Sequence, residues 1–107
     1  MKDVIWEPHG DYLEKSNVAV FMKRLGLGSY PDLHRWSVED IGRFWEACLA
    51  DRGVEWYRKY DKVYDTGDSK SFEWTKWFIG GKLNIAHNCL DRHAKDPARA
   101  STHAFLW

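Results

Sequence analysis

The sequence has no surplus of charge of either sign and no long apolar stretch. Its 107 residues carry sixteen Lys and Arg side chains against sixteen Asp and Glu, without a block of like charge. The field of such a chain does not attract a phosphate backbone, which argues against nucleic acid as a partner. Its apolar runs are only a few residues long, which argues against a membrane-spanning segment.

Cysteine is also scarce. The two cysteines, Cys48 and Cys89, lie far apart and each falls within an expected helix. This pattern suits reduced thiols better than a disulfide framework. The amino terminus lacks the apolar stretch of a secretory signal. The composition therefore predicts a soluble, cytoplasmic, globular chain of one domain or less.

Tryptophan is the residue type in excess, with seven copies. Large aromatic rings bury much area per residue, so a few of them can hold together a thin layer that lacks a deep core. The alternative is a set of exposed rings that stack on sugars or bases. We favour packing, because the tryptophans are scattered among irregular segments and do not repeat at strand spacing.

Two helices are predicted in the first half of the chain. Ser16 or Asn17 caps the first, and Gly26 ends it. The second and clearer helix is predicted to begin at Ser37, which caps it. Asp40, at the third helical position, pairs back with the cap in a weak form of the capping box. The glycine at position 53 ends the helix. Residues 31–36 are expected to form no more than a short helical turn.

The second half is predicted to be less regular. Residues 54–65 hold one short strand or lie extended, and 65–69 form a turn. A helix capped by Asn84 follows and ends before Pro97. Its apolar stripe consists of Leu83, Ala86, Leu90 and Ala94. Residues 102–107 are predicted to be a strand whose partners lie outside this sequence. The expected fold class is mainly α with short irregular β segments.

Two motifs raise the question of chemistry. Gly80-Gly81-Lys82 resembles part of a phosphate-binding loop. In such a loop a serine or threonine that binds the metal follows the lysine, and here a leucine follows it. A glycine turn with a solvated lysine is therefore favoured. Cys89 and His93, with His87 nearby, have the spacing of two zinc ligands or of a thiolate and its base. The other two ligands of a zinc site and a third catalytic group are missing, so a buried thiol beside a hydrogen-bonded histidine is favoured. We therefore expect no catalytic residue and no metal site.

The last predicted helix has a polar side. Asn84, Asn88 and Arg92 follow one another at intervals of four and share a helical face, next to Asp91. Such a face is either solvated or forms hydrogen bonds to the backbone of a larger protein. The sequence leaves both alternatives open.

Several blocks of the sequence together form a recognisable pattern. They are Trp77–Asn84, His87–His93, Ser37–Asp40 with Phe44-Trp45, and Ser16–Val18 with Phe21-Met22. In this order they resemble the N-terminal domain of the acetyl-CoA synthetase family. The resemblance covers nearly the whole chain and is most specific between Trp77 and Arg92. The expected signature and docking face consists of Trp77, Gly80, Gly81, Lys82, Asn84, Asn88, Asp91 and Arg92.

The resemblance implies that residues 1–107 are the helical entry segment of an α/β adenylation domain in a longer enzyme. Such a parent is an acid–thiol ligase that converts ATP, a short carboxylate and coenzyme A into acyl-CoA, AMP and pyrophosphate. ATP, Mg²⁺ and coenzyme A are then cofactors of the full-length enzyme, with none expected in this segment, which is inactive by itself. The expected partner is the remainder of the adenylation domain, and a second copy of the chain is a further candidate partner. The alternative is a free-standing helical module that binds a protein through exposed aromatic side chains.

Overall fold

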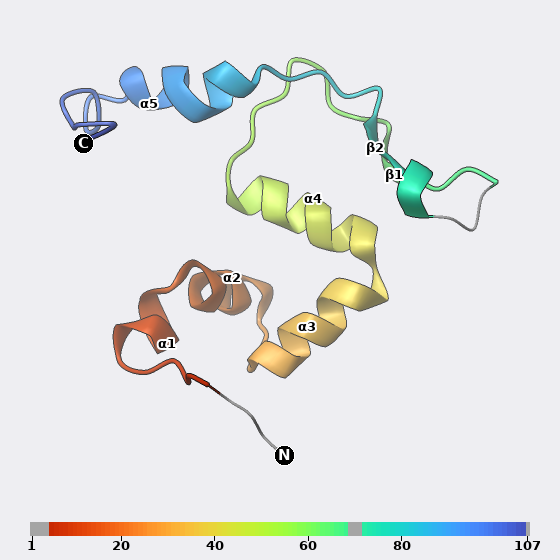
Figure 1. Ribbon diagram of the computed structural model, residues 1–107, viewed down its shortest axis with the longest axis horizontal. Helices are drawn as coiled ribbons and strands as arrows, with labels where there is room; N and C mark the ends of the chain where they lie inside the picture. The colour runs from red at the N-terminus through yellow and green to blue at the C-terminus, as the bar shows by residue number, and fades with distance from the viewer. Residues whose placement is uncertain (1–4, 69–71, 107) are drawn as a thin grey trace. The chain divides into compact units, whose positions relative to one another are not determined.

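Helices dominate the part of the chain that the computed structural model describes, residues 5–68 and 72–106 (Figure 1). Five α-helices and one two-stranded antiparallel sheet lie in this part, so the predicted class, mainly α with short β segments, is confirmed. The chain divides into two units, residues 1–47 and 48–107.

The first unit opens with α1 (Asp11–Lys15) and α2 (Asn17–Leu25). The hydroxyl of Ser16 accepts a hydrogen bond from the backbone N–H of Ala19 at 3.2 Å, which satisfies a donor at the start of α2. Gly26, with φ of 69°, ends the helix. Both predicted ends of this helix are confirmed, and the cap is Ser16.

The next helix, α3 (Tyr30–Glu39), is longer than the short turn predicted there. Ser29 caps it, since its hydroxyl accepts a hydrogen bond from the N–H of Asp32 at 3.3 Å. Pro31 lies in the first turn, where its missing N–H costs nothing. These local signals are the physical reason why the helix starts so early.

The predicted helix start at Ser37 is wrong. Ser37 lies inside α3, and the new helix, α4 (Ile41–Asp51), begins after Asp40. The carboxylate of Asp40 accepts a hydrogen bond from the N–H of Arg43 at 2.9 Å. Asp40 therefore acts as the helix cap and not as the partner of a cap at Ser37. The predicted stop is correct, because Gly53 has φ of 60° just beyond α4.

Packing in the first unit rests on one buried aliphatic side chain and on aromatic contacts. Leu33 of α3 is 8% exposed and is the only buried hydrophobic side chain in the described part of the chain. The rings of Trp36 and Phe44 meet edge to face at 6.3 Å, and the Arg43 guanidinium lies 4.7 Å from the centre of the Trp36 ring. The layer is thin, as the tryptophan content predicted.

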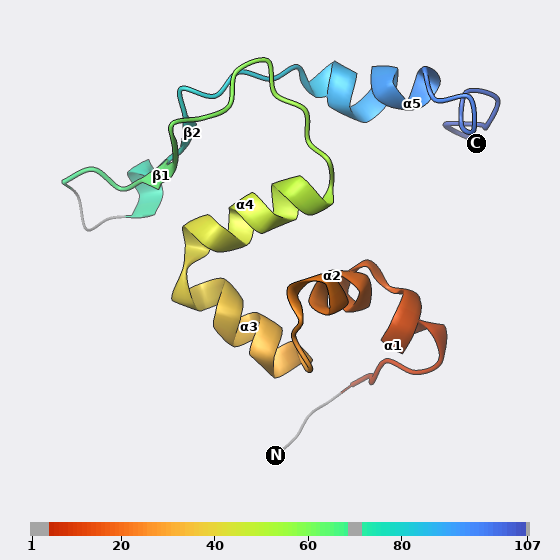
Figure 2. The same cartoon turned by 180° about the vertical axis from the view of Figure 1, so that it is seen from behind.

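The second unit contains a hairpin formed by β1 (Lys62–Asp65) and β2 (Lys76–Ile79), which run antiparallel (Figure 2). Tyr64 lies opposite Trp77, and their ring centres are 5.6 Å apart. Residues 62–65 thus form the short strand that was one of the two alternatives for residues 54–65. The 3₁₀ helix η1 (Phe72–Trp74) precedes β2.

Aromatic side chains also hold the hairpin to the segment before it. The rings of Trp56, Tyr60 and Phe78 pack together with centres 5.1–5.6 Å apart. In contrast, Trp6 is 58% exposed and Trp74 is 77% exposed. Tryptophan packing is therefore confirmed for part of the set, and other rings lie open on the surface.

The last helix begins with two helical residues, 85 and 86, and continues as a π-helical turn, η2 (His87–Asp91), and then as α5 (Arg92–Ala94). Residues 102–106 form no strand, so the strand predicted there is not found within the described residues. Thr102 instead closes a turn over residues 99–102, because its N–H and hydroxyl both donate to the carbonyl of Arg99, and no regular structure follows up to residue 106. A strand also needs a hydrogen-bonded neighbour, and none lies beside this segment in the described part. Trp107 lies outside the described residues.

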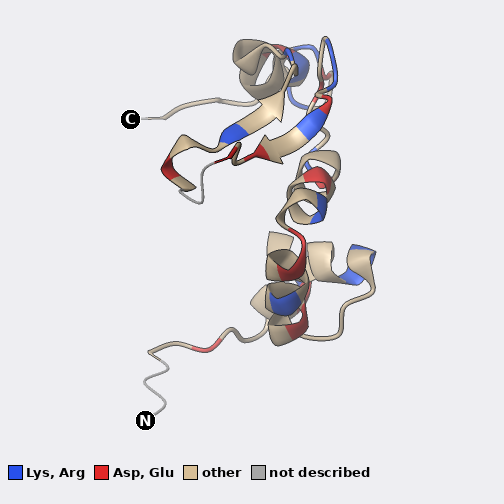
Figure 3. Cartoon of the chain, turned by 90° about the vertical axis from the view of Figure 1, so that its right-hand side faces the viewer, with Lys and Arg blue, Asp and Glu red and all other residues tan. Residues whose placement is uncertain are grey.

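Positively and negatively charged positions are both spread along the described part of the chain, without a long segment of one sign (Figure 3). Most ion pairs join residues three or four apart and lie at the surface, so each contributes little to stability. None of the described helices has the length and apolar character that crossing a membrane requires.

Candidate functional site

The polar side of the last helix contacts the backbone of this same chain. Asn84 caps the helix, since its side-chain oxygen accepts a hydrogen bond from the N–H of His87 at 3.2 Å. The predicted cap is therefore confirmed. The side-chain nitrogen of Asn88 then donates to the Asn84 carbonyl at 3.0 Å. These contacts stabilise the first turn and aim the next polar side chains at residues 52–55.

Asn88 pairs with the backbone of Glu55 in both directions. Its side-chain oxygen accepts from the Glu55 N–H at 2.8 Å, and its nitrogen donates to the Glu55 carbonyl at 2.9 Å. An asparagine side chain offers one acceptor and two donors, and here all three are used within the chain. The side-chain amide of Asn88 therefore satisfies the N–H and the carbonyl of Glu55 in the way that a neighbouring strand would.

Arg92 extends the same contact by one helical turn. Its guanidinium donates to the carbonyls of Arg52, at 3.0 Å, and Gly53. These carbonyls lie just past the end of α4, where helix carbonyls lack partners within the helix. A cation is also favoured at this negative end of a helix. Arg92 therefore binds the backbone just past the C-terminal end of α4 and connects it to the last helix within the second unit.

His87 adds a side-chain contact to this connection. Its Nε2 lies 2.5 Å from a carboxylate oxygen of Glu55. The hydrogen bond to His87 is the main cause that holds the pKa of Glu55 below its ordinary value. The charges of His87 and Arg92 act in the same direction. Asn84, His87, Asn88 and Arg92 are called the polar face below.

The predicted glycine turn is confirmed directly after β2. Gly80 has φ of 75°, a left-handed conformation that favours glycine. A methyl group there would collide with the Arg58 guanidinium and the Asp61 carboxylate. Arg58 holds both sides of the turn, because it pairs with the two Asp61 oxygens at 2.9 Å and donates to the Gly80 carbonyl. The lysine of the motif continues the pairing, as the Lys82 N–H donates to the Arg58 carbonyl at 2.9 Å.

Six of the eight signature residues lie in two groups. Asn88 and Arg92 meet the backbone of residues 52–55 and Asn84 caps their helix, whereas Gly80, Gly81 and Lys82 shape the turn. Trp77 is 46% exposed on the hairpin, and the Asp91 side chain is exposed. The side chains that pair with these residues, namely Glu55, Arg58 and Asp61, were not predicted as site residues from the sequence. The one signal in the sequence was the spacing of three between Arg58 and Asp61, and pairs with this spacing are common on protein surfaces.

The histidines and cysteines do not converge. His93 lies 3.3 Å from the guanidinium of Arg99, while His87 meets Glu55. Cys89 is exposed, so the predicted buried thiol is wrong at this position. Cys48 is half-buried, and burial raises the pKa of its thiol, with Asp51 adding to the effect. No group of three His, Cys, Asp or Glu side chains that could hold a metal ion exists in residues 5–68 and 72–106.

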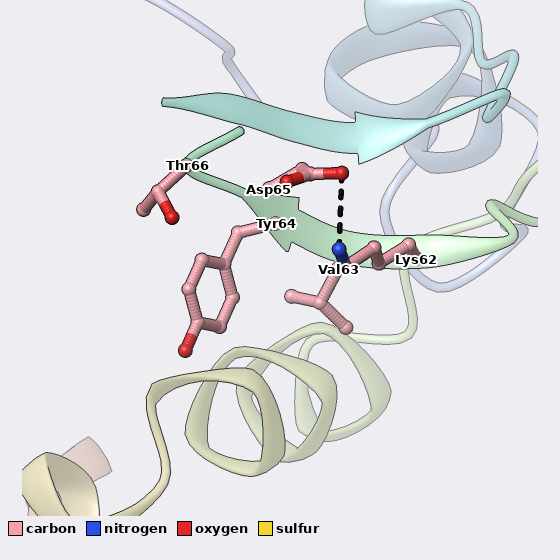
Figure 4. A pocket seen from close by; sticks show the side chains of 5 residues that line it. All are labelled: Lys62, Val63, Tyr64, Asp65 and Thr66. Carbon is pink, nitrogen blue, oxygen red and sulfur yellow. Dashed lines mark ion pairs between the residues drawn. The ribbon is translucent and has the colours of Figure 1, made fainter. Parts of the chain in front are cut away.

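A pocket beside β1 is lined by five consecutive residues, Lys62 to Thr66 (Figure 4). Lys62 and Asp65 form an ion pair across it at 3.0 Å. A site for catalysis needs polar groups that converge from several elements, with one or more of them buried. This pocket has neither property, so we assign no chemistry to it.

These contacts define a class of protein: a small, mainly helical module whose most distinctive polar side chains stabilise its own scaffold. A sequence-family model described as acetyl-coenzyme A synthetase N-terminus matches residues 30–89. The chain belongs to this family.

The similar proteins include much longer ones. The chain is 35% identical to the acetyl-coenzyme A synthetase of Methanothrix soehngenii over 96% of its own length. It is 37% identical to the acetyl-coenzyme A synthetase of Alkalilimnicola ehrlichii over its full length. It spans only 15% of each of these proteins. A third relative, a 16.9 kDa protein in the acs 3'region of Methanothrix soehngenii, is 34% identical, and the chain spans 59% of it.

Proposed function

We propose that this chain is the N-terminal structural segment of an AMP-forming acyl-CoA synthetase and is not catalytic alone. The observation that carries the proposal is the match of the whole chain to a small part of long acetyl-coenzyme A synthetases. Its partner is then the remainder of the adenylation domain, and its compartment the cytoplasm.

The exposed apolar surface supports this role. In the described residues only Leu33 is a buried hydrophobic side chain, whereas Phe72, Trp74 and Phe105 are each more than three-quarters exposed. Large apolar side chains with this much exposure are candidates for burial against another protein surface. Covering this surface with the body of a synthetase would supply the apolar burial that the segment lacks.

The chemistry of the parent is assigned to other parts of the enzyme. ATP and coenzyme A belong to the full-length synthetase in this proposal, together with the Mg²⁺ that accompanies ATP. The described residues contain no group of three His, Cys, Asp or Glu side chains that could hold a metal ion, and we place the Mg²⁺ with the ATP of the parent. No reaction step is therefore assigned to this chain. Its role is to hold the adenylation domain in one arrangement.

Sedimentation of the isolated chain, with and without a synthetase body, tests the proposal. The body is the acetyl-coenzyme A synthetase of Methanothrix soehngenii shortened by the segment that matches this chain. We expect a one-to-one complex, formed at the expense of any self-association. A chain that sediments identically with and without the body would contradict the proposal.

A second function is favoured by the 16.9 kDa relative, which is far shorter than a synthetase. The chain would then be a free-standing module that binds a protein through its exposed aromatic side chains. In the same sedimentation test, such a module remains a stable monomer or dimer that ignores the synthetase body. The experiment therefore separates the two functions.

A further inference from the structure

The last helix has its polar and apolar sides in the reverse of the usual arrangement. A surface helix normally turns its apolar stripe toward the core and its polar side to water. Here Asn88 and Arg92 point at the chain's own backbone between residues 52 and 55. The side that would normally meet solvent is therefore the one used for internal contacts.

The apolar stripe lies on the opposite side of this helix. Ala86, Leu90 and Ala94 are each two positions beyond Asn84, Asn88 and Arg92. Two residues correspond to about 200° of rotation in an α-helix and to a somewhat smaller angle in the wider π-helical turn of residues 87–91, so the two rows lie on roughly opposite sides. Ala86, Leu90 and Ala94 are called the apolar face.

The apolar face is open. Leu90 is 62% exposed, and Ala86 and Ala94 are exposed as well. Beside the start of the helix, Ile85 is 69% exposed. The exposed leucine stands between two alanines, whose small side chains let another backbone approach closely. The shape is that of one large side chain flanked by shallow positions, which suits insertion into an apolar groove.

We infer that the apolar face is the surface on which this segment docks to the body of an acyl-CoA synthetase. The inference rests on the proposed function and specifies its contact. The body is chosen as occupant because 85% of the length of the first matching synthetases lies outside this chain (100% minus the 15% that the chain spans). The polar face then orients the helix through its contacts within the chain, and the apolar face binds the synthetase body.

This assignment revises the role of the predicted docking residues. The hydrogen-bonding groups of Asn88 are all used within the chain, so they are not free for a partner. Their contribution to docking is to present Leu90 outward. Shape and apolar area, and not hydrogen bonds, then determine the affinity for the body.

Binding of variants to the same shortened Methanothrix synthetase tests the inference. Leu90→Glu places a charge in the contact, and Ala94→Lys adds bulk and charge at a helix C-terminus, where a cation preserves helix stability. We expect both to raise the Kd for the body by about tenfold or more, since each buries an unpaired charge. Circular dichroism should show unchanged helix content, because both positions are exposed in the chain.

Two matched variants serve as controls. Leu13→Glu makes the same change at a leucine of similar exposure, 58%, in α1. Ala50→Lys makes the same change at an exposed alanine near the end of α4. Both should leave the Kd unchanged. If Leu13→Glu and Ala50→Lys weaken binding as much as Leu90→Glu and Ala94→Lys do, the association with the body is non-specific. That result would overturn the inference.

The outcomes distinguish this inference from the proposed function. If the native chain binds the body and Leu90→Glu and Ala94→Lys bind equally well, the docking surface lies elsewhere and only the inference fails. If the native chain does not bind the body, both fail. If the chain instead forms a dimer that Leu90→Glu dissociates, the apolar face contacts a second copy, and the assigned occupant is wrong.

Discussion

Asn88 shows how one side chain can organise two separate segments. Its amide pairs with both backbone groups of Glu55, which lies 33 positions earlier in the chain. A backbone stretch outside any sheet would otherwise need water for these groups. Because the amide fits both groups at once, it specifies the position of the helix as well as its attachment.

We expect Asn88→Ala to destabilise the chain by about 1 kcal/mol, since it removes these bonds and leaves the partners to solvent. Urea unfolding followed by circular dichroism measures the loss. Hydrogen exchange at the Glu55 amide should accelerate, which ties the effect to this contact. Asn17→Ala, at an exposed position in α2, is the control and should change stability by no more than about 0.5 kcal/mol. Unchanged exchange at Glu55 would contradict the assignment.

The Glu55 carboxylate should respond to pH through His87. Its pKa is lowered in the folded chain, mainly by the hydrogen bond to that histidine. The ionised form is therefore favoured by folding. Its contribution is complete above the ordinary glutamate pKa of about 4.3 and is lost as the pH falls through the lower, folded value.

We expect His87→Ala to raise the pKa of Glu55 toward its ordinary range. Carbon-detected NMR titration of the Glu55 carboxyl group measures this directly. His34→Ala, which removes an exposed histidine of α3, should leave that titration unchanged. A Glu55 pKa that is the same with and without His87 would mean that the pair does not form in solution.

At the scale of elements, short local signals determine where helices and turns begin and end. Ser16, Ser29 and Asp40 each accept a backbone hydrogen bond at a helix start. The turn after β2 depends on Gly80 in the same local way, because its conformation is left-handed and its space is filled by Arg58 and Asp61.

Gly80→Ala should therefore destabilise the hairpin by about 1–2 kcal/mol. Gly28→Ala is a matched control, since that glycine has no positive φ and no neighbour within 4 Å of the added methyl group. It should leave stability unchanged or raise it by up to about 1 kcal/mol. Urea unfolding of both variants, side by side, measures the difference. Equal effects of the two substitutions would show that neither conformation nor space limits position 80.

At the scale of the whole molecule, the small amount of apolar burial determines stability. With Leu33 as the only buried hydrophobic side chain in the described part, the isolated chain has few of the contacts that make unfolding cooperative. Differential scanning calorimetry should show a broad transition, with an enthalpy well below the about 0.7 kcal/mol per residue of ordinary globular domains. Addition of the synthetase body should sharpen the transition and raise its midpoint.

A sharp transition with full enthalpy in the isolated chain would contradict this prediction. Its dependence on protein concentration would then show whether a second copy covers the apolar surface. An unfolding midpoint that rises with concentration indicates association between copies, because mass action favours the assembled state.

The sequence by itself determined the local features and the family. Ser16 and Gly26 bound α2 as predicted, Asn84 caps the last helix, and Gly80 makes a turn. Such features depend on side-chain and backbone groups within a few residues, so they can be inferred from spacing alone. The specific run between Trp77 and Arg92 is likewise contained in the sequence, and the family match agrees with it.

Only the tertiary structure decided which residues meet across long separations and which side of a helix is covered. The partners of Asn88 and Arg92, at residues 52–55, carry no mark in the sequence because backbone groups are the same at every position. The periodic pattern around Leu90 predicted an apolar stripe but not its direction. Direction follows from what the opposite side contacts, and here the polar side bonds to the chain's own backbone and leaves Leu90 exposed.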